Sequence, residues 1–229
     1  MKQPHLNRRQ ALALLGLSNL GAIKQAEVDL ALVLAIDCSF SVGAEEYHLQ
    51  MRGLGSALMN PQVFEAIQHG PNKKIAISAF LFADDQRQNL IIPWRTIAAH
   101  KDAFSMGMHL LNTSRDLAPG GTSISSALLF AQAFLKNAPK ALRQVVDIST
   151  DGINNSGPST MEVRDQLSVA GITINALAIV NEVKSLAAYL ESEVTSGEGS
   201  FVMKANSYQV YGEAILKKLI KEIEGPGIS

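Results

Sequence analysis

The chain has 229 residues, of which 47% are hydrophobic, so it can bury the core of one domain, and two domains fit only if one is very small. Its formal net charge is −1 and no basic stripe runs along it, which argues against a general nucleic-acid-binding protein. No window holds the ~20 uninterrupted apolar residues that a membrane-spanning helix needs.

Residues 1–26 have the pattern of a secretory signal peptide. Arg8 and Arg9 precede a short apolar run, 11–17, and small residues follow it. Paired arginines in this place also resemble a twin-arginine signal, although the general secretory route and an ordinary amphipathic helix remain alternatives. We therefore expect an exported protein, periplasmic or secreted, whose residues 27–229 form a single domain.

The first strongly apolar segment, 28–36, predicts a strand that is buried on both faces and ends at Asp37. Asp37, Ser39 and Ser41 then occupy every second position. An extended or gently turning backbone therefore directs their three side chains to one side. Cys38, which lies between them, is the only cysteine and excludes an intramolecular disulfide. We expect it to face away from them as small apolar packing.

Helices and strands are expected to alternate along the rest of the chain. Asp84 and Asp85 follow one of these strands and read as a solvated turn rather than as part of a site. The expected helices are 43–59, 96–111, 124–135, 160–170, 183–195 and 208–224, and the expected strands are 74–82, 89–92 just before Pro93, 143–150, 173–180 and a short one near Phe201. This order predicts an α/β fold with three layers, in which a doubly wound, mostly parallel sheet has helices on both faces.

Two further polar positions belong with the first cluster. Thr122 follows two glycines at the entrance of a helix, and Asp151 ends a strand, with Gly152 after it to permit a sharp turn. Because open α/β sheets bind ligands outside the carboxyl ends of their strands, we expect these positions to converge with the first three. Two carboxylates and three hydroxyls then form a cation site made only of oxygen. We call these five residues the oxygen cluster: Asp37, Ser39, Ser41, Thr122 and Asp151.

Other polar residues near these strands have more than one interpretation. Asp147 lies inside an apolar strand and must have a partner if buried, either as support for the cation site or as a structural hydrogen-bond acceptor. Asn154 and Asn155 are expected to shape the rim of the site through turn hydrogen bonds.

The pattern Asp-x-Ser-x-Ser, a distant Thr after glycines, and Asp-Gly at the end of a later strand resembles the metal-ion-dependent adhesion site of von Willebrand factor A domains, as in integrin inserted domains. The resemblance covers roughly residues 28–224. Four segments, 28–34, 45–50, 93–94 and 151–155, look more narrowly like a bacterial branch of exported A-domain proteins whose function is largely uncharacterised. The resemblance implies a vWA, Rossmann-like fold.

The resemblance also implies roles for the oxygen cluster. The serines and the threonine would ligate Mg²⁺ directly, Asp37 directly or through water, and Asp151 through water, with Mn²⁺ or Ca²⁺ as alternative ions. Neutral hydroxyls leave the ion under-neutralised, so the expected partner is a protein that presents Asp or Glu to an open coordination position. The expected module is monomeric on its own, binds no nucleic acid and has no transmembrane span.

Phe40 departs from the family pattern, which often has glycine at this position. A phenylalanine at the rim would narrow access to the metal or offer an apolar contact to a partner. The interpretation that we favour from sequence is a side chain tucked under the loop, because most phenylalanines are substantially buried.

The main alternative is a magnesium-dependent phosphohydrolase with Asp37 as nucleophile. Enzymes that resemble the haloacid dehalogenases carry a second aspartate two residues further on as acid and base, where this chain has Ser39, a poor proton donor or acceptor near neutral pH. A structural domain without metal is a third alternative, which the presence of all five ligand types disfavours. We therefore expect a binding module rather than an enzyme.

Overall fold

The computed structural model describes residues 26–226, so all of the predicted signal peptide except Ala26 lies outside the described residues. The strands are β1 (Val28–Asp37), β2 (Ile75–Phe82), β3 (Gln88–Ile97), β4 (Ala141–Thr150), β5 (Ile172–Ile179) and β6 (Val202–Ala205). The helices are α2 (Ala44–Met59), α3 (Pro61–His69), α4 (His100–Leu111), α5 (Ile124–Leu135), α6 (Thr160–Val169), α7 (Leu186–Glu193) and α8 (Tyr211–Glu224), with a 3₁₀ turn η1 (Tyr208–Val210) before α8.

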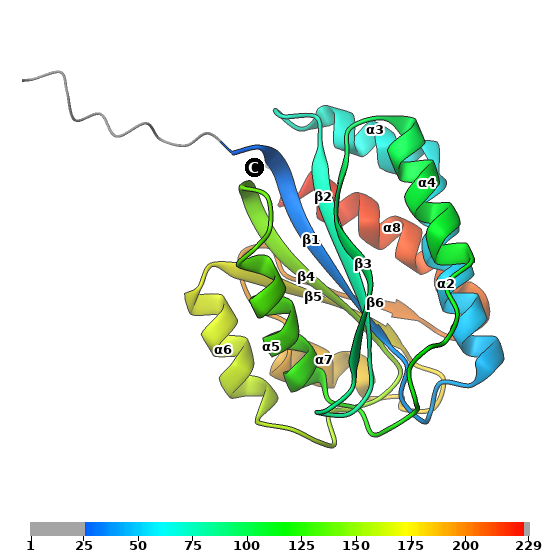
Figure 1. Cartoon of the computed structure of the whole chain (residues 1–229). Helices are drawn as coiled ribbons and strands as arrows, with labels where there is room; N and C mark the ends of the chain where they lie inside the picture. The colour runs from blue at the N-terminus through cyan, green and yellow to red at the C-terminus, as the bar shows by residue number, and fades with distance from the viewer. Residues whose placement is uncertain (1–25, 227–229) are drawn as a thin grey trace, which may run out of the picture.

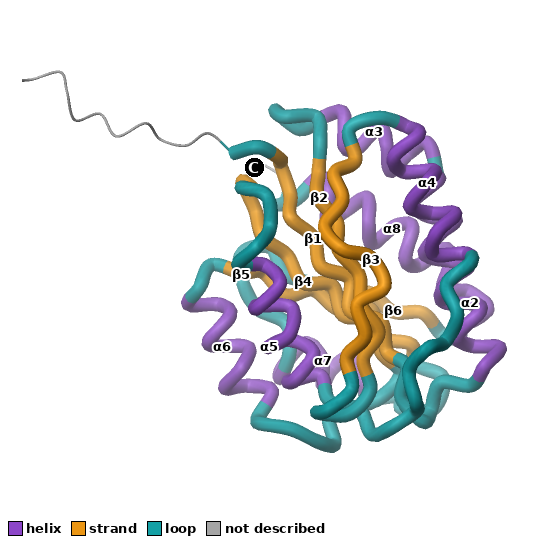
Figure 2. Tube along the Cα trace, viewed as in Figure 1, coloured by secondary structure: helices purple, strands orange, loops and turns teal. Residues whose placement is uncertain are grey.

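The strands form one six-stranded sheet in the order β3-β2-β1-β4-β5-β6, in which only β3 runs antiparallel to its neighbour. Helices α2, α3, α4 and α8 cover one face, and α5, α6 and α7 cover the other (Figures 1 and 2). The expected α/β fold, with a mostly parallel sheet between two helical layers, is confirmed. Among residues 26–226, none of the helices combines the length and the apolar character needed to cross a bilayer.

The core explains why β1 and β2 read as continuous apolar runs. Both strands are central, and every residue of each is buried. A strand that is covered on both faces must be apolar on both faces. Apart from Asp29 near its start, which accepts hydrogen bonds from Asn72, β1 is apolar up to Asp37, so the polar residues at its end stand out.

The short strand predicted to stop before Pro93 instead continues to Ile97. β3 is an edge strand, and its pairing with β2 shifts register between Ile77 and Ala79, opposite Pro93. The Ser78 hydroxyl fills this irregularity by donating to the Ile92 carbonyl at 2.8 Å. A proline, which has no N–H to donate, is tolerated at an edge and at a bulge.

Two helix predictions also need correction. The helix expected from residue 96 begins at His100, because the preceding residues belong to β3. The sequence analysis did not predict α3. The Asn60 side chain caps this helix by accepting a hydrogen bond from Gln62 N at 2.9 Å, and Pro61 occupies its first turn.

Candidate metal centre

The predicted site residues meet at the carboxyl edge of the sheet, at the lower end of the view in Figure 1. β1 and β4 are parallel neighbours, with Ile36 opposite Ser149. The next residues along the two strands, Asp37 and Thr150, therefore lie beside each other, and Asp151 follows. Parallel pairing alone brings two aspartates that are far apart in sequence to one place.

Four members of the oxygen cluster form a continuous hydrogen-bonded chain. Ser39 N donates to Asp37 Oδ1 at 2.8 Å, and the Ser39 and Ser41 hydroxyls lie 3.1 Å apart. The Ser41 hydroxyl then donates to Asp151 Oδ1 at 2.6 Å. The Ser39 and Ser41 hydroxyls therefore lie on one side of the loop, as predicted, although residues 39–42 form a turn in which Val42 N donates to the Ser39 carbonyl at 3.2 Å.

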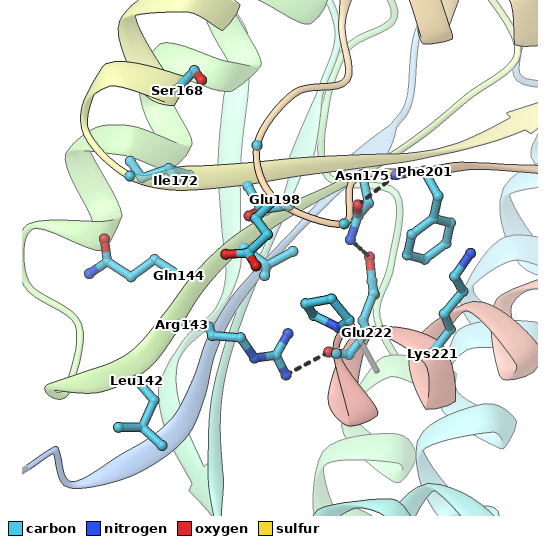
Figure 3. Close-up of a pocket in the computed structure, with 17 residues that line it drawn as sticks. Leu142, Arg143, Gln144, Ser168, Ile172, Asn175, Glu198, Phe201, Lys221 and Glu222 are labelled. Carbon is cyan, nitrogen blue, oxygen red and sulfur yellow. Dashed lines mark hydrogen bonds between the residues drawn. The ribbon is translucent and has the colours of Figure 1, made fainter. Parts of the chain in front are cut away.

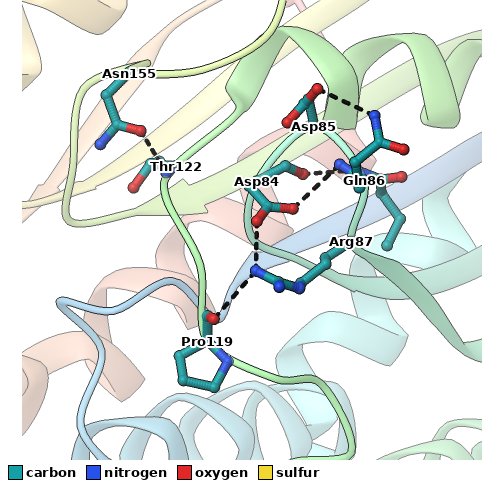
Figure 4. A network of polar contacts seen from close by, with 8 residues as sticks. Asp84, Asp85, Gln86, Arg87, Pro119, Thr122 and Asn155 are labelled. Atoms are coloured by element: carbon teal, nitrogen blue, oxygen red, sulfur yellow. Dashed lines mark hydrogen bonds and ion pairs between the residues drawn. The ribbon is translucent and has the colours of Figure 1, made fainter.

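Thr122, the fifth member, packs against the residue that follows Asp151. A Cβ on Gly152 would lie only 3.1 Å from Thr122 Oγ1, so a larger residue would fit only if Thr122 shifted by a few tenths of an ångström. The chain bends at Asp151 and Gly152, as expected, although Gly152 does not adopt a positive φ. Asn155 fixes the pair of loops, because its Oδ1 accepts from Thr122 N and its own N–H donates to Thr122 O, both at 2.8 Å (Figure 4).

The two aspartates are both buried, and they lie close enough to affect each other electrostatically. Burial raises the pKa of Asp37 to about 6, and the nearby Asp151 carboxylate adds to the rise. The pKa of Asp151 is also raised, mainly by burial, although hydrogen bonds from Ser41 and Tyr208 act against the rise. Within the described residues, no Lys, Arg or His forms an ion pair with either aspartate. A divalent cation would relieve this repulsion.

The donor set is suited to a hard cation. Within residues 26–226, no three His, Cys, Asp or Glu side chains gather in a way that could hold a metal ion. A cation at the oxygen cluster would therefore depend on the three hydroxyls as well as on the two carboxylates. Four members of the cluster are buried and Ser41 is exposed, so the cluster opens to solvent on the Ser41 side.

The structure adds residues that the sequence analysis missed. Tyr208, from η1, donates to Asp151 Oδ2 at 2.9 Å, and the Thr150 hydroxyl donates to Asp37 Oδ2. Gln50, on α2, donates to the Asp37 carbonyl at 3.2 Å. Thr150 is signalled only by its place next to an aspartate, and Tyr208 and Gln50 have no local signal, because tertiary packing of their helices places them here.

Arg115 supports the loop that follows β1. Its guanidinium donates to the carbonyls of Val42, Cys38 and Ser39 at 2.6, 3.1 and 3.1 Å. Its Nε also lies 3.1 Å from the Cys38 sulfur, and Cys38 is buried as expected. An isolated arginine in a loop gives no sequence pattern that would reveal this role.

Phe40 does not tuck under the loop, so the interpretation favoured from sequence was wrong. Its side chain is 74% exposed. Arg115 contacts the Cys38 sulfur on the inner side of this loop, and Phe40 N donates to the Gly120 carbonyl at 2.9 Å. These contacts fix the backbone and leave the aromatic ring at the rim of the oxygen cluster.

Asp84 and Asp85 form the expected turn after β2 (Figure 4). Asp84 accepts from Gln86 N at 3.1 Å and from the Arg87 guanidinium at 2.5 Å, and Asp85 is exposed. Arg87 also donates to the Pro119 carbonyl at 3.3 Å. The turn therefore supports the loop that leads to Thr122 without entering the oxygen cluster.

Asp147 belongs to the core and not to this site. Its carboxylate lies 2.7 Å from Lys218 Nζ on α8, and Lys218 Nζ lies 2.5 Å from Glu222 Oε1. Asn175 on β5 donates to the same Glu222 oxygen at 3.0 Å. All four side chains are buried. Of the two interpretations left open, the structural one is therefore supported.

A cavity of about 410 Å³ lies at the opposite edge of the sheet, between the beginnings of β4 and β5 and the end of α8 (Figure 3). Arg143 lines it and donates to the carbonyls of Glu222 and Ile223 at 2.9 and 2.8 Å. The guanidinium thus ties the last turn of α8 to β4. These polar groups hold the helix on the sheet, and the oxygen cluster remains the candidate site.

The fold is von Willebrand factor A-like, as the resemblance implied. The structure is similar to proximal thread matrix protein 1 from the mussel byssus, with a TM-score of 0.63 and 17% identity over 86% of this chain and 48% of that one. A second structure of the same mussel protein is described as having a zinc-occupied MIDAS motif. A von Willebrand factor type A structure from Catenulispora acidiphila is also similar, with a TM-score of 0.60 and 16% identity over 86% of this chain and 43% of that one.

Residues 27–227 match the family described as "Protein of unknown function (DUF1194)", and the chain belongs to this family. The pilus adhesin SpaC from Lactobacillus rhamnosus GG is another similar structure, with a TM-score of 0.61 and 14% identity over 87% of this chain and 31% of that one. The chain thus spans less than half the length of these structural relatives. None of the curated proteins matches it.

Proposed function

We propose that the oxygen cluster holds a divalent cation, Mg²⁺ in the first place and Mn²⁺ or Ca²⁺ as alternatives, and that the protein is a metal-dependent protein-binding module. The observation that carries this proposal is the hydrogen-bonded chain from Asp37 through Ser39 and Ser41 to Asp151. The two carboxylates at its ends have no cationic side chain paired with them among the described residues.

The donor chemistry favours a metal ion that binds a partner protein over one that has only a structural role. Mg²⁺ takes about six oxygen ligands and usually keeps waters, so a shell dominated by three neutral hydroxyls, with Asp151 acting through water, would leave it with charge and with an exchangeable position. When bound, the ion would offer that position to an Asp or Glu of a partner protein. Ser41 lies on the side that opens to solvent, and Tyr208 and Thr150 orient the two carboxylates from behind.

The structure gives no support to the phosphohydrolase alternative. Asp37 has no exposed surface, and both of its carboxylate oxygens accept hydrogen bonds from neighbouring residues. A nucleophile must reach the phosphorus of its substrate, and Ser39 stands where an acid and base would be needed. The similar structures named above include a matrix protein and a pilus adhesin, which agrees with a binding role.

Capture of partners with and without metal tests the proposal. Immobilised protein is exposed to an envelope extract in Mg²⁺ and eluted with a chelator, and each candidate is then purified and titrated directly. We expect its affinity to fall with the chelator and with Thr122→Ala, while circular dichroism shows an intact fold. It should fall again when one Asp or Glu of the partner is changed to Asn or Gln. Binding that persists undiminished after complete metal removal would mean that the interaction uses another surface.

We also propose that the protein is exported, on the basis of the sequence pattern of residues 1–26. The test is given with the predictions below.

A further inference from the structure

We infer that the partner segment carries an apolar side chain two residues from its acidic residue, which packs on Phe40 or Ile153 at the rim of the oxygen cluster. The inference rests on the proposed function and adds the specificity of that same site. It starts from two large apolar side chains with high exposure, 74% for Phe40 and 46% for Ile153.

Both residues flank the opening of the cluster. Phe40 lies between Ser39 and Ser41, and Ile153 lies two residues after Asp151. They come from the loops after β1 and β4, the neighbouring parallel strands whose ends carry Asp37 and Asp151. A partner atom that reaches the open side near Ser41 therefore comes close to both loops. Single exposed apolar residues need no explanation elsewhere on a surface, but two of them beside one polar opening form a mixed contact surface.

The backbone that presents these side chains is fixed. Phe40 N donates to the Gly120 carbonyl at 2.9 Å, and Arg115 holds the same loop from below. After Ile153, the Asn154 side chain accepts from Ser125 N at 3.1 Å, at the start of α5. Apolar side chains on fixed loops lose little entropy on binding, which is the property of an interface anchor.

The spacing in the partner follows from strand geometry. In an extended segment, residues i and i+2 point to the same side and lie about 7 Å apart. A carboxylate directed into the cluster therefore places the side chains two positions before and after it over the rim. Apolar residues at those positions would contact Phe40 or Ile153, whereas the residues next to the acid point away.

The charges around the opening also limit the partner. Glu46 lies close to the β1 loop, because its carboxylate accepts from Gly43 N at 2.7 Å, and both Glu46 and Glu182 act electrostatically on Asp151. The carboxylates of Glu46 and Glu182 would repel a second acidic residue in the partner. The segment that fits best has one Asp or Glu, apolar residues two positions away, and Lys or Arg rather than a further acid near Glu46 and Glu182.

Selection from a displayed library of short random peptides tests the inference. The purified full chain is immobilised in Mg²⁺, and bound peptides are released with EDTA and sequenced. We expect enrichment of Asp or Glu with an apolar residue two positions away. Phe40→Ser combined with Ile153→Ser should remove the apolar preference and weaken the selected peptides about tenfold, as truncation of a contacting anchor does. Phe104→Ser, at a residue that is 59% exposed on α4, is the matched control and should change neither.

The outcomes separate the two proposals. An acidic preference without the apolar one, or an apolar preference that survives the double substitution, overturns the inference and leaves the metal-dependent function standing. No enrichment of acidic residues over the unselected library overturns both. The double variant must also keep the Mg²⁺-dependent rise in melting temperature of the wild type, which shows that its loss of peptide binding comes from the rim.

Discussion

Asp37 is the residue on which the site depends most, because it combines full burial with a second carboxylate nearby. Burial and Asp151 raise its pKa to about 6, while Ser39 and Thr150 donate hydrogen bonds to its two oxygens. Without a metal ion, folding shifts the protonation equilibrium of Asp37 toward the neutral acid. With a cation bound, the carboxylate becomes the favoured form.

This arrangement predicts a pH dependence of metal-free stability. The pKa of Asp37 is about 6 in the folded protein against an ordinary value of 3.8, so its stabilising contribution is complete below 3.8 and is lost as the pH rises through about 6. The difference corresponds to about 3 kcal/mol at 1.36 kcal/mol per pH unit. Glu222, whose pKa burial raises to about 8, adds a decline of the same sign.

Denaturant titrations in EDTA at several pH values isolate the Asp37 contribution when wild type is compared with Asp37→Asn. The free energy of unfolding should fall more steeply between about pH 4 and 6 in the wild type than in the variant. Mg²⁺ should stabilise the wild type more at about pH 7.5 than at about pH 5, because protons compete with the ion. Parallel pH profiles for the two proteins would be evidence against this role of Asp37.

The hydrogen bond from Tyr208 to Asp151 leads to a second prediction, about Mg²⁺ affinity. Tyr208→Phe removes the hydrogen bond to Asp151 Oδ2 but keeps the ring, so Mg²⁺ affinity should fall about 10- to 100-fold, as it does when partners of metal ligands are lost. Tyr211→Phe, which removes a contact to the Ser149 hydroxyl instead, is the control. Calorimetric titration with Mg²⁺ measures both, and equal affinities in the two variants would exclude an orienting role for Tyr208.

Among the elements, α8 carries the most unusual packing, because it buries charge. Lys218 is fully buried between Asp147 of β4 and Glu222 of its own helix, and Asn175 of β5 completes the group. Two acids for one base raise the pKa of Glu222 to about 8, with burial as the largest cause. The group fixes how α8 lies on the sheet, because it joins this helix to both β4 and β5.

Lys218→Met should destabilise the protein by about 3–5 kcal/mol, because it leaves two buried acids without their cation. Lys217→Met is the matched control: this neighbour pairs with Glu213 at 2.7 Å on the exposed side of the same helix, and such pairs contribute about 0–1 kcal/mol. Chemical denaturation gives both values. A similar small loss in the two variants would show that the buried pairs contribute little.

The helices and strands show how much of the fold could be predicted from the sequence. β1, β2 and α5 were predicted almost to the residue, because periodicity and burial act on each of them alone. The extent of β3 was not predicted, since tolerance of Pro93 depends on its place at the edge of the sheet. α3 was missed because its cap, Asn60, follows α2 directly and reads as part of a loop.

The same distinction between local sequence pattern and tertiary packing applies to the site. The sequence predicted the oxygen cluster because its members sit at strand ends and at a helix entrance, where the fold places them together. It did not predict Tyr208 or Arg115, because their positions depend on how separate elements pack. It also gave the wrong orientation for Phe40, whose side chain is exposed. The Arg115 guanidinium lies on the inner side of this loop, where it donates to the carbonyls of Val42 and Cys38.

For the whole molecule, export remains a proposal that rests on the sequence pattern of residues 1–26. Replacing Arg8 and Arg9 with lysine keeps the charge but should leave the precursor inside the cell, because the twin-arginine route requires the arginines themselves. Fractionation followed by N-terminal sequencing measures this. Equal export of the variant would refute the twin-arginine route, and a mature protein that still begins at Met1 would refute the signal.

Melting of the purified, metal-stripped protein with and without divalent cations tests the proposed site most directly. An ion that binds only the folded state stabilises it by RT ln(1 + [L]/Kd), about 2.7 kcal/mol at a hundred times Kd. We expect Mg²⁺ or Mn²⁺ to raise the melting temperature of the wild type by several degrees, and Asp37→Ala and Asp151→Ala to abolish the rise. A wild-type melting curve that stays unchanged in Mg²⁺, Mn²⁺ and Ca²⁺ would contradict a cation site at the oxygen cluster.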